Sequence, residues 1–144
     1  MKPRRNKRYQ PRPVRIPITG LRDMIALHMH ASLAGVAVAG DVDSFNSLAD
    51  IMNMVSVAID GDKRYAHEQL LIQGGVRAMN DILARLEAHL PLQEHHIAPV
   101  RVAVTAIDCV LPWLDVTKLY LAEQVAVAAG RAQRQAAERE DARP

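Results

Sequence analysis

Apolar side chains recur every three or four residues through the middle of the chain, and this spacing constrains its fold more than any other feature. They are Phe45, Leu48, Met52, Val55 and Ile59. On a helix these side chains share one face, whereas Asn46, Asp50 and Asn53 fall on the opposite one. The pattern predicts an amphipathic helix over residues 44–60, with Ser44 as its N-cap.

Helical spacing also precedes and follows this segment. A first helix is expected over residues 19–39, with a buried face made of Leu21, Met24, Ile25, Leu33 and Val36. A longer helix is expected over residues 62–89, ended by Pro91, with an apolar stripe made of Tyr65, Ile72, Val76, Met79, Leu83 and Leu86. Gly74 and Gly75 lie inside it and cost about 1 kcal/mol each in a helix interior. Either the helix kinks there, or another backbone packs closely against it.

The segment over residues 97–114 fits two patterns. Val100, Val102 and Val104 alternate as in a strand. A helical stripe is also present, made of Ile97, Val100, Val104, Ile107, Leu111 and Leu114. Because a lone strand has no partner in a helical chain, we favour a helix with Pro99 in its first turn. A fifth helix is expected from about Asp115.

These segments predict an all-α protein, a bundle of four to five helices over residues 18–130 with an extended basic N-terminal arm over 1–17. Residues 131–144 form a polar, helix-prone tail. The 144 residues suit one domain, and no apolar run has the length of a membrane span. One cysteine, Cys109, permits neither an internal disulfide nor a cysteine-based zinc site, which fits a reducing compartment. We therefore expect a cytoplasmic protein. No cofactor or metal is expected either.

The arm carries seven basic residues and no acidic one, namely Lys2, Arg4, Arg5, Lys7, Arg8, Arg12 and Arg15. Eleven basic and sixteen acidic residues remain, so positions 16–144 carry a net charge of −5. Four prolines favour an extended, partly polyproline-II conformation for this arm. Three interpretations stay open: a solvated tail, phosphate contacts to nucleic acid with Tyr9 available for stacking, or docking on an acidic protein surface, including a second copy.

No catalytic motif is present, and the candidate reactive residues have simpler interpretations. Glu94–His96 lacks the spacing of a zinc-binding helix and fits a polar loop better. His28 and Cys109 are expected in the core, and Asp23 with His30 on a solvated edge. Trp113 is expected as a core plug, with a binding hot spot as the alternative. Trp113 and the polar edge that includes Arg101 and Asp108 are therefore the candidate interface residues.

The opening "KPRRNKRYQPRPV" resembles the start of small helical proteins of unknown function encoded by bacteriophages and prophages. "FNSLADIMN", residues 45–53, is similar to their second helix. The resemblance spans about the first sixty residues. It implies a mobile genetic element in a bacterium as the context, and no particular activity.

We therefore expect a non-enzymatic accessory protein that binds a host protein or nucleoprotein complex, for example as an inhibitor of a defence or transcription machine. The alternative is direct DNA or RNA binding through the arm, although no expected helix carries a basic face. A homodimer is also compatible with the sequence, and a membrane partner is not expected.

Overall fold

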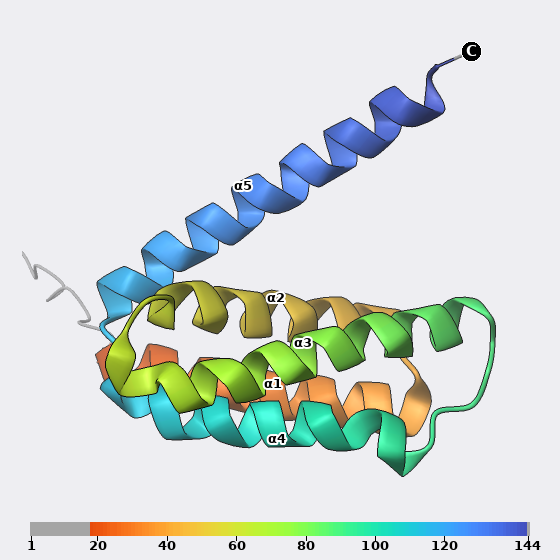
Figure 1. Cartoon of the computed structure of the whole chain (residues 1–144). Coiled ribbons are helices and arrows are strands. Elements are labelled where there is room, and N and C mark those ends of the chain that lie inside the picture. Colours follow the sequence, from red (N-terminus) through yellow and green to blue (C-terminus); the bar gives the residue numbers. More distant parts are fainter. Residues whose placement is uncertain (1–17, 144) are drawn as a thin grey trace, which may run out of the picture.

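The computed structural model describes residues 18–143, and Figure 1 shows their arrangement. The five α-helices are α1 (Ile18–Ala34), α2 (Val42–Ile59), α3 (Ala66–Glu87), α4 (Glu94–Val110) and α5 (Val116–Asp141). No strand occurs between residues 18 and 143, which confirms the all-α prediction. The arm over residues 1–17 lies outside the described residues, so its extended conformation stays a prediction.

Helices α1 to α4 form an up-and-down bundle, and α5 projects away from it (Figure 1). A short π-helix, η1 (Gly35–Ala39), extends α1, and two short 3₁₀ helices, η2 (Lys63–Tyr65) and η3 (Leu111–Trp113), precede α3 and α5. The start of α1, η2 and η3 lie together at one end of the bundle, which we call the arm end. None of the helices between residues 18 and 143 is long and apolar enough to cross a membrane.

Helix α2 carries the predicted stripe, and all five of its apolar members are buried. The three polar residues expected on the opposite face, Asn46, Asp50 and Asn53, are exposed. The N-cap is Asp41 and not Ser44, because the Asp41 carboxylate accepts hydrogen bonds from the backbone N–H of Ser44 at 2.9 Å and from its hydroxyl at 2.6 Å.

Helix α3 runs without interruption through the two glycines, so close packing, rather than a helix break, explains them. A Cβ built on Gly75 would lie 2.3 Å from the Cβ of Ala103 and 2.8 Å from the Cε of Met52. A Cβ on Gly74 would meet no atom within 4 Å. Gly75 therefore allows α3 to approach α4 closely, and only one of the two glycines has this role.

The end of α3 differs from the prediction. The fully buried residue near this end is Ile82, whereas Leu83 is half-buried. The helix ends at Glu87, well before Pro91. His89 adopts the left-handed conformation at φ 53°, and the Leu90 N–H donates to the Arg85 carbonyl at 2.9 Å. This closing turn is a Schellman motif, which ends the helix without help from the proline.

Helix α4 confirms the helical interpretation of residues 97–110, and all six residues of its predicted stripe are buried. The strand alternative is wrong. The helix begins at Glu94, so Pro99 is its sixth residue and does not lie in the first turn.

Helix α1 is oriented differently from the prediction. Met29 and Leu33 of α1 and Val36 of η1 are in the core, whereas Leu21 is 39% exposed and Met24 is 66% exposed. His28 is also exposed and is not a core histidine. Apolar side chains occur on more than one side of this helix, so spacing alone did not identify the buried side.

Helix α5 begins at Val116, and the Asp115 carboxylate caps it by accepting a hydrogen bond from the Thr117 N–H at 2.8 Å. Only Leu119 and Ala122 are buried in this helix. It continues as one helix to Asp141, and the part that includes the predicted tail is exposed (Figure 1).

The two glycines of α3 provide a matched pair of variants. We expect Gly74→Ala to stabilise the protein by about 0.5–1 kcal/mol, because it removes backbone freedom without a new contact. Gly75→Ala should destabilise it by about 1–3 kcal/mol, because the added methyl overpacks the α3–α4 interface. Urea unfolding followed by circular dichroism measures both. Equal effects of the two substitutions would contradict the close approach.

Candidate interaction surface

The arm end holds both the start of α1 and the connection between α4 and α5. The start of α1, which continues the basic arm, is tied to the segment after η3, since Arg22 of α1 donates a hydrogen bond to the carbonyl oxygen of Leu114 at 2.5 Å. A shallow hollow of about 190 Å³ lies beside this link, lined in part by Arg22, Asp108 and Pro112. The link fixes where the arm leaves the bundle relative to the connection between α4 and α5.

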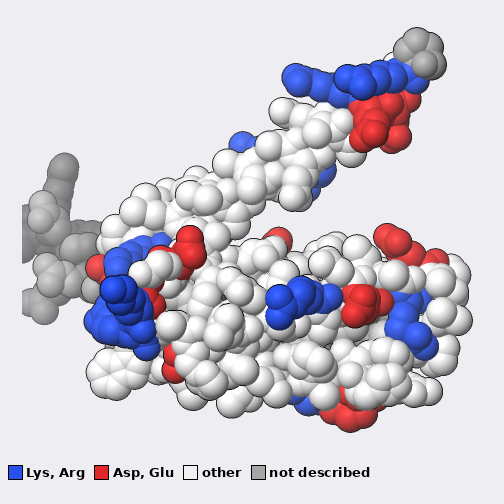
Figure 2. All heavy atoms as spheres, viewed as in Figure 1, with Lys and Arg blue, Asp and Glu red and all other residues white. Residues whose placement is uncertain are grey.

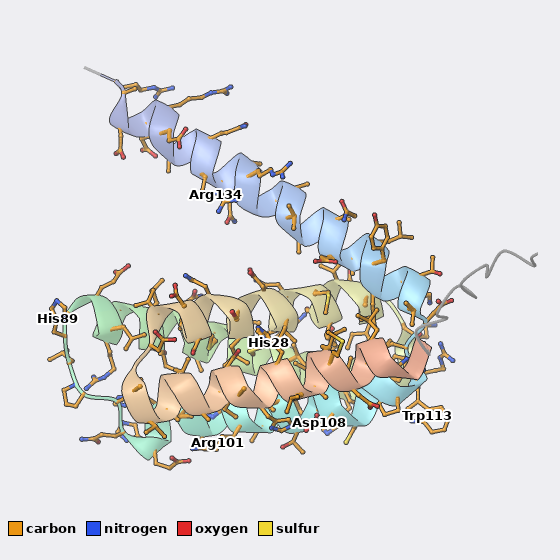
Figure 3. All side chains as sticks on the ribbon, turned by 180° about the vertical axis from the view of Figure 1, so that it is seen from behind. His28, His89, Arg101, Asp108, Trp113 and Arg134 are labelled. Carbon is orange, nitrogen blue, oxygen red and sulfur yellow. The ribbon has the colours of Figure 1, made fainter. Side chains whose placement is uncertain are left out.

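Trp113 lies at this same end of the molecule (Figure 3). Its side chain is 78% exposed, so the core-plug interpretation is wrong. The residue before it is Pro112, within η3, and the core positions on either side are taken by Leu111 and Leu114. An exposed tryptophan on a short, anchored segment has the properties of a binding hot spot.

Asp108 connects two helices. One of its carboxylate oxygens lies 2.7 Å from Nε2 of His30 on α1, so this pair holds α4 against α1. Asp23 makes no hydrogen bond to a side chain among the described residues. The partner of His30 therefore lies on α4 and not on its own helix, α1. Asp108 is therefore already occupied by a neighbouring side chain, which reduces its capacity to contact a partner.

Arg101 lies apart from Trp113 in Figure 3. Twelve residues separate them along α4 and η3, about 18 Å at the helical rise. Its guanidinium contacts both carboxylate oxygens of Glu94 on its own helix, at 2.8 and 3.5 Å. Of the three predicted interface residues, Trp113 and Asp108 thus lie toward the start of α1, and only Arg101 lies apart. The arm residues themselves, from Lys2 to Arg15, lie outside the described part of the chain.

Charged side chains of both signs surround the arm end (Figure 2). At the start of η2, the Asp62 carboxylate accepts hydrogen bonds from the side chain and backbone N–H of Arg64, which lower the pKa of Asp62 to about 2. The Arg64 guanidinium also lies 5.4 Å from the centre of the Tyr65 ring. This arrangement fixes one arginine in place.

Other residues with chemical potential are dispersed. Among residues 18–143, no three His, Cys, Asp or Glu side chains lie close enough to hold a metal ion. The Gln93 N–H donates to Nδ1 of His96 at 3.0 Å, so this histidine serves the start of α4. Partial burial, with the charges of Arg85 and His95, lowers the pKa of His96. Cys109 is exposed and is not the core residue expected from the sequence.

A groove that the sequence did not indicate separates α5 from the bundle and has a volume of about 620 Å³. Its bundle wall, from α1 and α2, includes Met24, Ile25, Ile51 and Met54. Its other wall, from α5, includes Glu123, Ala126, Val127, Gly130 and Arg134. The signal that could have revealed it is the second apolar side of α1, where Leu21, Met24 and His28 follow each other at helical spacing.

No family model, curated protein sequence or solved structure matches this chain.

The contact between Asp62 and Arg64 predicts a measurable titration. The pKa of Asp62 should be about 2 and should rise toward its ordinary value in Arg64→Gln, because both charge and hydrogen bond are removed. Because folding lowers this pKa, the contribution of Asp62 to stability is complete above about pH 4 and is lost as the pH falls through 2. Carboxyl ¹³C chemical shifts against pH measure the value. The control is Arg77→Gln on α3, which should leave the pKa of Asp62 unchanged. An ordinary pKa of Asp62 in the parent protein would contradict the contact.

Proposed function

We propose that this protein is a non-enzymatic accessory protein of a phage or prophage that binds a host protein or nucleoprotein complex in the bacterial cytoplasm. One observation carries the proposal. The exposed Trp113 lies at the end of the bundle from which the basic arm continues. The phage context rests on the resemblance of the first sixty residues.

The two parts of this surface supply different kinds of binding energy. Lysine and arginine side chains contact phosphates or carboxylates and give affinity that falls with salt. A tryptophan buried on binding removes a large apolar area from water and orients the partner. A partner that combines an acidic or phosphate-bearing surface with an apolar pocket satisfies both, as a host nucleoprotein complex does.

The link between Arg22 and Leu114 gives these parts a fixed relation. Because α1 is held to the segment after η3, the start of α1, to which the arm is joined in sequence, has a defined position relative to Trp113. The arm and the tryptophan can therefore engage one partner together, and loss of either should weaken the same complex.

Three variants test this arrangement in pull-downs from bacterial lysate, with and without nuclease. Deletion of residues 1–15 and Trp113→Ala should each reduce capture of the same nuclease-resistant partner. Val38→Ala is the matched control, since Val38 is 89% exposed and lies in η1 at the opposite end of the bundle. If neither change reduces capture relative to this control, the arm end is not the binding surface.

Salt dependence distinguishes direct nucleic-acid binding, the alternative function. Each neutralised phosphate contributes about 0.9 to the slope of log K against log salt on duplex DNA. If the arm alone binds DNA, anisotropy of a labelled duplex should show a slope of several units that deletion of residues 1–15 abolishes, and Trp113→Ala should have little effect. Recovery of nucleic acid alone, lost after nuclease treatment, would favour that alternative over the proposal.

A further inference from the structure

The distal part of α5 is exposed and packs against no other helix among residues 18–143. After Ala122, its residues leave the bundle (Figure 1), and the groove lies between them and the α1–α2 wall. Isolated helices of this length are marginally stable in water, because packing rather than propensity supplies most helical stability. Contacts from outside this chain would therefore stabilise the distal helix.

This part of α5 is apolar on two opposite sides. Ala126 and Val127 line the groove. Val125 is more than half exposed and, by helical spacing, lies on the other side of the helix, as does Leu121 just before this part begins. A helix with two apolar sides fits a groove with two walls, since each side of an inserted helix contacts one wall. A second copy of the distal α5 would therefore be a suitable occupant of this groove.

The two charged residues on the α5 wall of the groove are self-complementary. Glu123 and Arg134 are equally far in sequence from the midpoint between Val127 and Gly130. If a second α5 lies antiparallel across this midpoint, Glu123 of each copy faces Arg134 of the other. Val127 then faces Gly130, whose missing side chain leaves space for the larger one. Figure 3 shows Arg134 on the side of α5 that faces the bundle.

We propose that the groove is occupied by α5 of a second copy of this chain, which forms a two-fold symmetric dimer with antiparallel α5 helices. The groove sides of the two helices pack on each other with two Glu123–Arg134 pairs. The outer side of each distal helix faces the α1–α2 wall of the other copy. The interface is isologous, as a two-fold dimer requires.

Charge reversal tests this register. Sedimentation equilibrium of the full chain should show a dimer. Glu123→Arg and Arg134→Glu should each weaken dimerisation by about tenfold or more, because each creates two like-charge pairs. The double variant restores opposite charges and should recover most of the lost affinity. Both positions are exposed, so each variant should remain folded, which circular dichroism checks.

Arg77→Glu is the control, since Arg77 is exposed on α3 and does not line the groove; it should leave dimerisation unchanged. A parent protein that stays monomeric at every concentration overturns the proposal, and the groove then belongs to the basic arm or to another protein. A dimer in which the double variant is no better than the single ones also overturns it. These results are independent of the arm, since deletion of residues 1–15 leaves every proposed dimer contact in place.

Discussion

The close approach of α3 to α4 at Gly75 is the centre of the most extensive helix–helix packing in the bundle. At this point the Cβ of Ala103 occupies the space that a side chain on α3 would need. The glycine costs about 1 kcal/mol of helix propensity, which the burial of α4 against α3 offsets. Because α4 is fixed by this contact, the connection at its end is fixed as well. That connection exposes Trp113 and directs α5 away from the bundle.

The sequence predicted the helices whose apolar residues lie on one side only. In α2 and α4 a single stripe meets a single core, so spacing identified both the helix and its buried face. The strand-like alternation left an alternative open, because a strand would bury Val102 together with Val100 and Val104, whereas in α4 Val102 is 47% exposed. The cap of α2 was missed by three residues, since Asp41 and Ser44 both precede the apolar stripe and either fits a capping position.

The sequence failed where a helix is apolar on more than one side. Met24 and Met29 have the same hydrophobic character, yet only Met29 is in the core. Which side of α1 faces inward depends on where α2 and α4 pack, and one sequence contains no direct measure of that. Trp113 and Cys109 were misplaced for a related reason: each is a single residue outside any repeating pattern, so its residue type suggested burial although the chain turns it outward. His30 and Asp108 are 78 positions apart in the sequence, so no local sequence pattern predicts their pairing.

The two proposed surfaces together restrict the kind of partner that gains from binding both arms. In the antiparallel arrangement the first residues of the two α5 helices are separated along the shared axis by the length of about 25 helical residues, roughly 40 Å. Each start lies beside an arm end, so in the proposed dimer the two α1 starts, to which the arms are joined, lie at separated places related by a two-fold axis. A partner with one binding site would engage only one of them. A repeating or symmetric partner, such as nucleic acid or an oligomeric host complex, can engage both, and the second contact then forms at high effective concentration. The dimer thus favours a nucleoprotein or oligomeric partner over a small monomeric one.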